Sequence, residues 1–250
     1  MRTFSAAYLA TIATTVVVTT ALTLAARRRP GRWLLVADVL LAAVLLAVTA
    51  AWFVSTLRGP FRAATSLPLP LCDLATLVAS AALLTRNRLL AELTYFWGLA
   101  GSLQSLLTPD LSAPFPSLVF FEYVLAHAGI VCAAVFLVAG QHLTPRPKAV
   151  PRVLVITLAY AAVVGAVDAT TGGNYMYLRR PPGNWTLLKV LGPWPWYIAS
   201  ALGVAVVLFT LLDLPFWRGR RRDRPGGQSA GGGEGALAAE GQEGEASVMA

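Results

Sequence analysis

The chain has 250 residues, of which 56% are hydrophobic and only 13% are charged. Because charged residues make up about 25% of a typical soluble domain, this composition excludes an ordinary water-soluble fold and indicates an integral membrane protein. The formal net charge is +8, but the basic residues lie in short loops between apolar runs, where they set membrane topology. We therefore expect membrane lipid, and no nucleic acid, as a partner.

Seven apolar runs follow one another, each close to the length that crosses about 30 Å of hydrocarbon as a helix. They cover residues 4–26, 33–53, 67–84, 89–107, 116–138, 150–169 and 196–216. The first is too long for the apolar core of a signal peptide, and a basic cluster follows it, so we interpret it as a span. The sequence predicts an all-α bundle of seven transmembrane helices over residues 1–217.

The loops differ in charge. Of the 20 lysine and arginine residues, 14 fall on one predicted side of the membrane and 6 on the other. The positive-inside rule therefore places the N-terminus outside and the C-terminus in the cytoplasm, as expected for a multi-pass protein of the cell membrane. Residues 218–250 are basic at first and then rich in glycine and acids, which predicts a disordered cytoplasmic tail.

Three acidic residues lie near the predicted cytoplasmic ends of their spans. They are Asp38, Glu92 and Asp213. Ionisable groups inside a membrane are costly, and arginines of the adjoining loops can reach these positions. We predict ion pairs at the helix ends.

A thiol and an imidazole share one predicted depth. Cys72 lies 12 residues from the cytoplasmic end of its span at residue 84, and His127 lies 11 residues from residue 138. At about 1.5 Å per residue these counts give about 18 Å and about 17 Å. A cysteine beside a histidine suggests nucleophilic catalysis, in which the imidazole takes the thiol proton. The alternative is a packed cysteine and a histidine bonded between helices.

Further polar residues occupy the outer half of the spans. They are Asp73, Gln104, Glu122 and Asp168. With loops 108–110, 171–180 and 191–197 above them, they predict a polar cavity that opens toward the outer leaflet. Which residue orients the imidazole stays open among Asp73, Gln104, Glu122 and Tyr123.

The cysteines and histidines indicate neither a metal site nor a disulfide framework. The chain has two of each, and no CxxC motif occurs. Cys132 lies five residues deeper than His127 and is interpreted as packing. No metal or cofactor is expected.

Five sequence blocks carry a resemblance to a known family. They are LPLPLCDLA, YFWGLAGSLQSLLTPDL, FFEYVLAHAGIV, TGGNYMYLRRPP and LLKVLGPWPWYI. Over about residues 33–216 the chain resembles the YwaF-type conserved bacterial integral membrane proteins. More distantly it is similar to the animal transmembrane protein 164 family.

The resemblance implies a chemistry and a site. The animal family is described as fatty-acyltransferases that act on phospholipids with a catalytic cysteine and histidine, which match Cys72 and His127. The matching blocks also contain Gln104, Asp110, Asn174 and Tyr175, to which the resemblance assigns no role.

Three functions are compatible with these features. The first is a thiol-dependent acyltransferase or lipid-remodelling enzyme, with an acyl chain among the helices and the lipid headgroup near Arg179 and Arg180. The second is a transporter or sensor of a small solute or lipid, in which Asp168 and Glu122 are essential and Cys72 is not. The third is a structural membrane subunit whose polar residues only fix helix packing.

Overall fold

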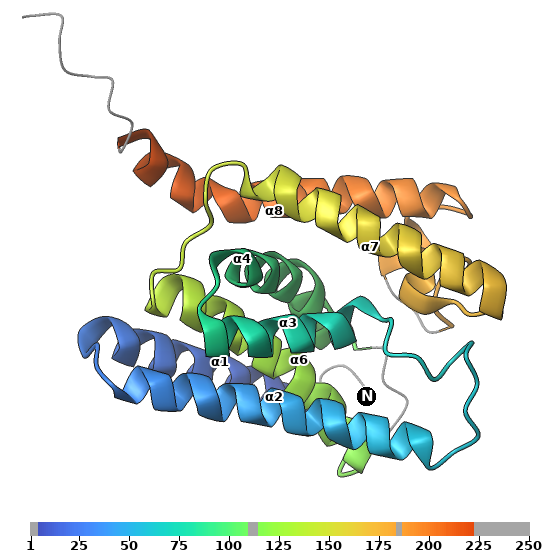
Figure 1. Cartoon of the computed structure of the whole chain (residues 1–250), viewed down its shortest axis with the longest axis horizontal. Coiled ribbons are helices and arrows are strands. Elements are labelled where there is room, and N and C mark those ends of the chain that lie inside the picture. Colours follow the sequence, from blue (N-terminus) through green and yellow to red (C-terminus); the bar gives the residue numbers. More distant parts are fainter. Residues whose placement is uncertain (1–4, 110–114, 184–186, 223–250) are drawn as a thin grey trace, which may run out of the picture. The chain divides into compact units, whose positions relative to one another are not determined.

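The computed structural model describes residues 5–109, 115–183 and 187–222, with the backbone alone for 218–222. The helices in chain order are α1 (Ala6–Arg28), α2 (Trp33–Leu57), α3 (Leu71–Thr85), α4 (Arg88–Trp97), η1 (Gly98–Ser102), α5 (Leu103–Leu107), α6 (Leu118–Val135), η2 (Phe136–Gly140), α7 (Ala149–Thr171), η3 (Tyr175–Tyr177), η4 (Leu187–Val190) and α8 (Trp196–Arg222) (Figure 1). Asp110 and residues 223–250 of the predicted tail lie outside the described residues.

The chain divides into two units, Met1–Leu214 and Pro215–Ala250. Each is described by itself. The second unit contains the last part of α8, including Pro215. The first unit contains every candidate site residue.

Among the described residues, five helical segments are long and apolar enough to cross a membrane. They are α1, α2, α6 continued by η2, α7, and the part of α8 up to Trp217. Large apolar side chains on them are exposed, for example Val17 (65%), Leu40 (62%) and Val155 (65%). Such surfaces are stable only when lipid covers them. The predicted all-α, multi-pass membrane fold is confirmed, with five candidate spans.

The third predicted span is shorter than expected. The helix α3 has 15 residues, a rise of about 22 Å, and begins at Leu71. Pro70 is its N-cap in an extended conformation, and a proline supplies no amide N–H for a preceding helical turn. The prediction that this helix begins at residue 67 was therefore wrong.

The fourth predicted span is helical but interrupted. A π-helical turn, η1, separates α4 from α5. Gly98 opens this turn against α6, where an added Cβ would lie 3.0 Å from the Cβ of Ala134. A small residue is needed for so close an approach of two helices. This contact presses α4 and η1 onto α6.

The central helix of the first unit is α6. In the candidate span formed by α6 and η2, 61% of the residues of an 18-residue apolar stretch are buried. The corresponding share is 11–17% in the other four candidate spans. It contacts α1, α2, α3, α4, η1 and α5. At Gly129 an added Cβ would lie 2.6 Å from Cδ2 of Leu45, so α2 and α6 are closely packed there. His127 lies two residues away.

Two buried carboxylates hold one end of this unit together. Asp38 in α2 is 2% exposed and pairs with Arg86 at the end of α3, at 2.7 Å between Oδ2 and Nη2. Glu92 in α4 is fully buried. The predicted ion pairs at the helix ends are confirmed for these two residues, while Asp213 is also buried.

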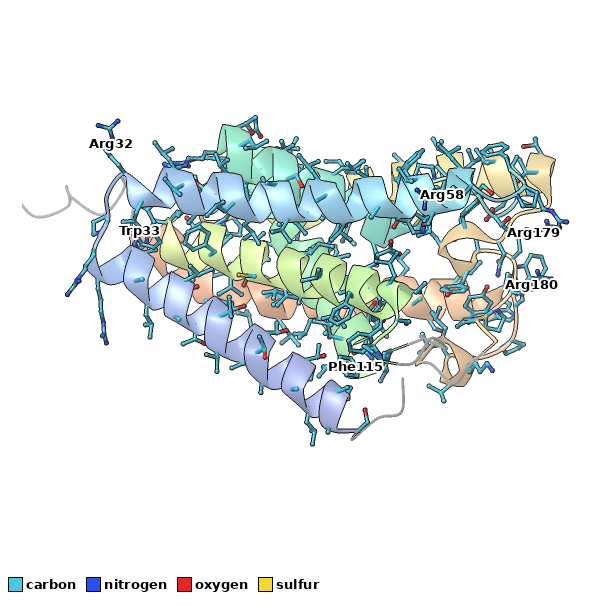
Figure 2. All side chains as sticks on the ribbon, turned by 90° about the horizontal axis from the view of Figure 1, so that it is seen from below. Arg32, Trp33, Arg58, Phe115, Arg179 and Arg180 are labelled. Atoms are coloured by element: carbon cyan, nitrogen blue, oxygen red, sulfur yellow. The ribbon has the colours of Figure 1, made fainter. Side chains whose placement is uncertain are left out.

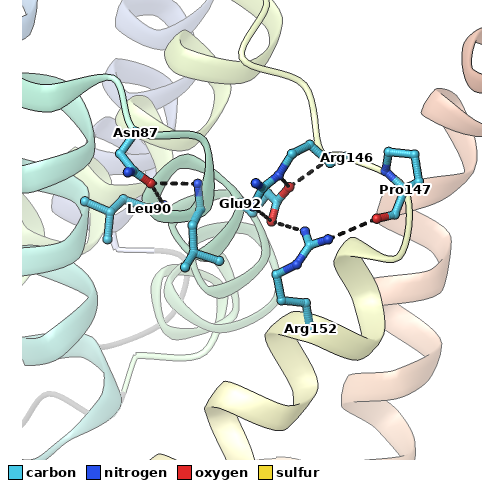
Figure 3. A network of polar contacts seen from close by, with 7 residues as sticks. Asn87, Leu90, Glu92, Arg146, Pro147 and Arg152 are labelled. Atoms are coloured by element: carbon cyan, nitrogen blue, oxygen red, sulfur yellow. Dashed lines mark hydrogen bonds and ion pairs between the residues drawn. The ribbon is translucent and has the colours of Figure 1, made fainter.

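Glu92 is the most fully paired acid among the described residues (Figure 3). Its Oε1 accepts hydrogen bonds from the backbone N–H (2.9 Å) and Nε (2.8 Å) of Arg146. Its Oε2 accepts from Nη2 of Arg146 (3.2 Å) and Nη1 of Arg152 (2.6 Å). The same contacts raise the pKa of Arg146. Glu92 thus fixes the segment before α7, and the start of α7, against α4.

The opposite end of the unit carries other basic residues. Figure 2 shows Arg32 and Trp33 at one end and Arg58, Arg179 and Arg180 at the other. This arrangement agrees with the predicted division of the loops into two sets. It leaves the assignment of each set to a side of the membrane as a prediction.

Candidate functional site

Cys72 lies in the first turn of α3 because the two prolines delay the start of the helix. It is the second residue after the N-cap Pro70. Its thiol lies near Ser105 in α5, whose hydroxyl donates to the carbonyl of Gly101 at 3.3 Å. The carbonyl of Cys72 accepts a hydrogen bond from Thr76 at 2.8 Å. Among the described residues its amide N–H has no backbone partner, as is usual in the first turn of a helix. The positive end of the helix dipole therefore lies beside the thiol.

His127 lies on α6 and is 8% exposed. Its Nδ1 lies 2.8 Å from the carbonyl oxygen of Tyr123, one turn earlier. A carbonyl only accepts hydrogen bonds, so Nδ1 carries a proton, and Nε2 of the neutral ring has a free lone pair. The two rings also pack together, with centroids 4.2 Å apart. Of the four orienting candidates, Tyr123 is the one that contacts the imidazole.

A chain of contacts joins the thiol to the imidazole. The thiol lies near Ser105, whose carbonyl accepts a hydrogen bond from the hydroxyl of Tyr123 at 2.7 Å. Tyr123 in turn holds the His127 ring. No hydrogen bond between described residues joins Cys72 to His127 directly. The two groups belong to one cluster, in which Ser105 and Tyr123 lie between them.

A cavity of about 220 Å³ lies between α2, α3 and α6, beside this cluster. Its polar lining consists of Thr49, Asp73, Thr76, Glu122, Tyr123 and His127. Cys72 does not line it, although Asp73 and Thr76 of the same helix do. Trp52, near the C-terminal end of α2, and Pro68, just before α3, also line it.

The carboxylates of this cavity are incompletely paired. Oδ2 of Asp73 and Oε1 of Glu122 are buried and have no hydrogen-bond partner among the described residues. No lysine or arginine of the described chain lines the cavity. Buried polar atoms are normally bonded, so each such atom calls for an explanation. Among the described residues no group of three His, Cys, Asp or Glu side chains could hold a metal ion.

Other predicted cavity residues lie elsewhere. Gln104 donates a hydrogen bond to Thr108 at 3.0 Å, on its own helix end. Oδ1 of the fully buried Asp168 accepts from the backbone N–H of Tyr175 at 2.9 Å, which closes the turn after α7. Neither residue lines the 220 Å³ cavity.

The residues of the predicted outer loop form hydrogen bonds with one another and with the segment before α3. The hydroxyl of Tyr175 donates to the carbonyl of Ala63 (2.9 Å) and accepts from the N–H of Leu67 (2.9 Å), which ties this loop to the segment before α3. The amide oxygen of Asn174 accepts from the N–H groups of Arg179 and Arg180, at 3.0 Å each. Both arginines are exposed, and Nη1 of Arg179 contacts two carbonyls.

Sequence reasoning missed three residues of the site. Ser105 lies near the thiol, while Trp52 and Thr76 line the cavity. Thr76 lies one turn after Cys72, so helical spacing could have found it. Nothing in the sequence pairs Ser105 or Trp52 with this site, because both come from other helices.

A larger apolar hollow of about 700 Å³ lies between α1, α2 and α6. Cys132 lines it and is 5% exposed. The residues of α6 that line this hollow differ from those that line the smaller cavity. Cys132 and His127 therefore line different cavities, and the interpretation of Cys132 as packing stays a prediction.

Fold and site together define a class: a multi-pass helical membrane protein with a polar cluster and cavity around its central helix. Within that class the chain belongs to the TMEM164 family, whose family profile matches residues 2–213. Neither the comparison with curated proteins nor that with solved structures gave a match. The narrower YwaF-type resemblance stays a prediction.

Proposed function

We propose that this protein is a thiol-dependent acyltransferase or lipid-remodelling enzyme of the membrane, with Cys72 as nucleophile and His127 as general base. The observation that carries the proposal is the cluster Cys72–Ser105–Tyr123–His127. It brings the two residues matched by the family resemblance into one connected site. The TMEM164 family membership supports the same chemistry.

The proposed reaction has two steps. In the first, Nε2 of His127 takes the thiol proton, and the sulfur attacks the ester carbonyl of a lipid. The acyl C–O bond then breaks, and the departing alkoxide takes the proton back from His127, which leaves an acyl thioester on Cys72. In the second, His127 deprotonates an acceptor alcohol, or water, which attacks the thioester and releases the Cys72 thiol.

Local structure assists this chemistry at three points. The bond from Nδ1 to Tyr123 fixes the tautomer in which Nε2 is the base. The free N–H of Cys72 can donate to the oxyanion that forms on the carbonyl carbon, a type of contact that is commonly a large catalytic term. The hydroxyl of Ser105, which donates to the carbonyl of Gly101, can turn and donate to the thiolate. Because catalytic contacts often tighten only when substrate is bound, the indirect contact between thiol and imidazole is compatible with these roles.

The membrane arrangement completes the proposal. Seven helical segments cross the bilayer, with the N-terminus outside and the C-terminus in the cytoplasm of a cell membrane. The site then opens toward the outer leaflet. Arg179 and Arg180, which are exposed at that end (Figure 2), contact the lipid phosphate.

The test is lipid profiling of cells that express either the wild type or Cys72→Ala. We expect the wild type to change the distribution of acyl chains among membrane lipids, and Cys72→Ala to lose this effect. Cys132→Ala is the matched control and keeps it. If well-expressed Cys72→Ala gives the wild-type lipid profile, the proposal is wrong.

A second candidate function is favoured by the cavity itself. Two buried carboxylate oxygens without partners among the described residues suit a transporter or sensor of a small solute. In that case Cys72→Ala keeps the function, whereas Glu122→Gln abolishes solute binding. A purely structural subunit is less favoured, because the unpaired oxygens of Asp73 and Glu122 lie on residues that line one cavity, whereas buried polar atoms are normally paired.

A further inference from the structure

We propose that the cavity between α2, α3 and α6 is a binding site for an organic ammonium group. The inference concerns binding alone and does not depend on the thiol. Its basis is the chemistry of the described lining, which presents acceptors, negative charge and aromatic surface without a lysine or arginine.

The cavity lining contains hydrogen-bond acceptors without a partner among the described residues. Oδ2 of Asp73 and Oε1 of Glu122 are buried without a partner among the described residues. His127 is more than nine-tenths buried and lines the same cavity, and no hydrogen bond from the described part of the chain reaches its Nε2. The nearby hydroxyl of Thr76 already donates to Cys72. The cavity therefore offers unused acceptors, and its complement is a cationic donor.

Charge leads to the same class of ligand. A buried carboxylate is stable only when a cation pairs with it or a proton neutralises it. Elsewhere in the described chain Asp38 and Glu92 have arginine partners, but none of its lysines or arginines lines this cavity. A bound cation supplies the charge partner that Asp73 and Glu122 lack among the described residues.

The rest of the lining selects an organic cation over a metal ion. Among the described residues no three His, Cys, Asp or Glu side chains converge closely enough to hold a metal. Trp52 and Tyr123 line the cavity together with Pro68 and Leu77. Aromatic faces attract alkylammonium ions through their quadrupole, and apolar side chains accept the alkyl part. A cavity of about 220 Å³ has room for a small group of this kind.

The ammonium group can come from a free amine or from a lipid headgroup. The test uses the full-length protein in nanodiscs of phosphatidylglycerol, which has no ammonium group. Methylammonium, ethanolamine and tetramethylammonium are titrated at constant ionic strength, with sodium and calcium chloride as controls. Binding is followed by thermal stability and by tryptophan fluorescence, with Trp52→Phe to assign the signal.

We expect saturable binding of at least one organic ammonium ion. Binding should weaken about 10- to 100-fold in Asp73→Asn and in Glu122→Gln, as for the loss of a charged hydrogen bond. The matched variant Glu122→Asp keeps the charge and should retain most of the affinity. Cys72→Ala should bind like the wild type, so a failure of the catalytic proposal leaves this one standing.

A second experiment identifies whether the ammonium group comes from a lipid headgroup or from a free amine. If nanodiscs that contain phosphatidylethanolamine reduce the affinity for the soluble probes, the group belongs to a lipid headgroup. If they do not, it belongs to a free amine. The proposal is overturned if no organic ammonium ion binds, if sodium or calcium binds equally well, or if the Asp73→Asn, Glu122→Gln double variant binds like the wild type.

Discussion

Two sets of acids in the described part of the first unit differ in how fully they are paired: Asp38 and Glu92 are buried, whereas Asp73 and Glu122 are half-buried. Glu92 is fully buried and receives four hydrogen bonds from two arginines. Asp73 and Glu122 each have a buried oxygen without a partner among the described residues and share a cavity with His127. A fully paired acid fixes the fold, whereas an unpaired one beside a cavity is available for a ligand. Substitutions should separate these two roles, with the loss of stability decreasing from the paired acids to the cavity acids.

Replacing the most fully paired acid should affect stability most. We expect Glu92→Gln to lower the free energy of unfolding by about 3–5 kcal/mol, because it removes the charge of a fully buried acid that pairs with two arginines. Thermal unfolding of the purified protein in detergent measures this. A loss below about 1 kcal/mol would show that the Glu92 cluster does not hold the bundle together.

Asp38 should have a smaller effect. It pairs with one arginine, Arg86, whereas Glu92 pairs with two. We expect Asp38→Asn to cost about 1–3 kcal/mol in the same assay. A loss of stability larger than that of Glu92→Gln would contradict the ranking of the two acids by their number of arginine partners.

The predicted outer loop contains an uncharged group that is hydrogen-bonded, the hydroxyl of Tyr175. The Tyr175 hydroxyl joins Ala63 and Leu67 by two hydrogen bonds. Tyr175→Phe should cost about 1–2 kcal/mol and leave ligand binding in the cavity unchanged. Hydrogen exchange of the segment before α3 is the more specific readout, and unchanged protection there would argue against the anchor.

The cavity acids should affect stability least. Asp73→Asn and Glu122→Gln remove charges that have no partner among the described residues, so we expect changes within about 0.5 kcal/mol, or a small gain in stability. Binding of organic ammonium ions should nevertheless weaken. If either variant is destabilised as strongly as Glu92→Gln, the two sets of acids do not differ in role.

The fold was largely predictable because hydrophobic runs and helix rise are local properties. Cys72 and His127 each lie 13 residues from the end of their helical segments, at Thr85 and at Gly140, and their common depth in a membrane stays a prediction. The predicted start of α3 at residue 67 was wrong, because Pro70 and not the hydropathy pattern determines where this helix begins.

The composition of the site was less predictable. Depth does not say which way a helix is turned, so it could not separate Asp168, which closes its own loop, from Glu122, which lines the cavity. Ser105 and Trp52 reach the site from other helices, and only the packing around α6 reveals them.

The most direct test of the central claim is intact-mass spectrometry of the protein isolated from membranes. We predict a fraction that carries one fatty-acyl group, is cleaved by hydroxylamine, and disappears in Cys72→Ala but persists in Cys132→Ala. His127→Gln should form the adduct far more slowly. An adduct that resides on Cys132, or no adduct together with an unchanged lipid profile, would contradict Cys72 as the nucleophile.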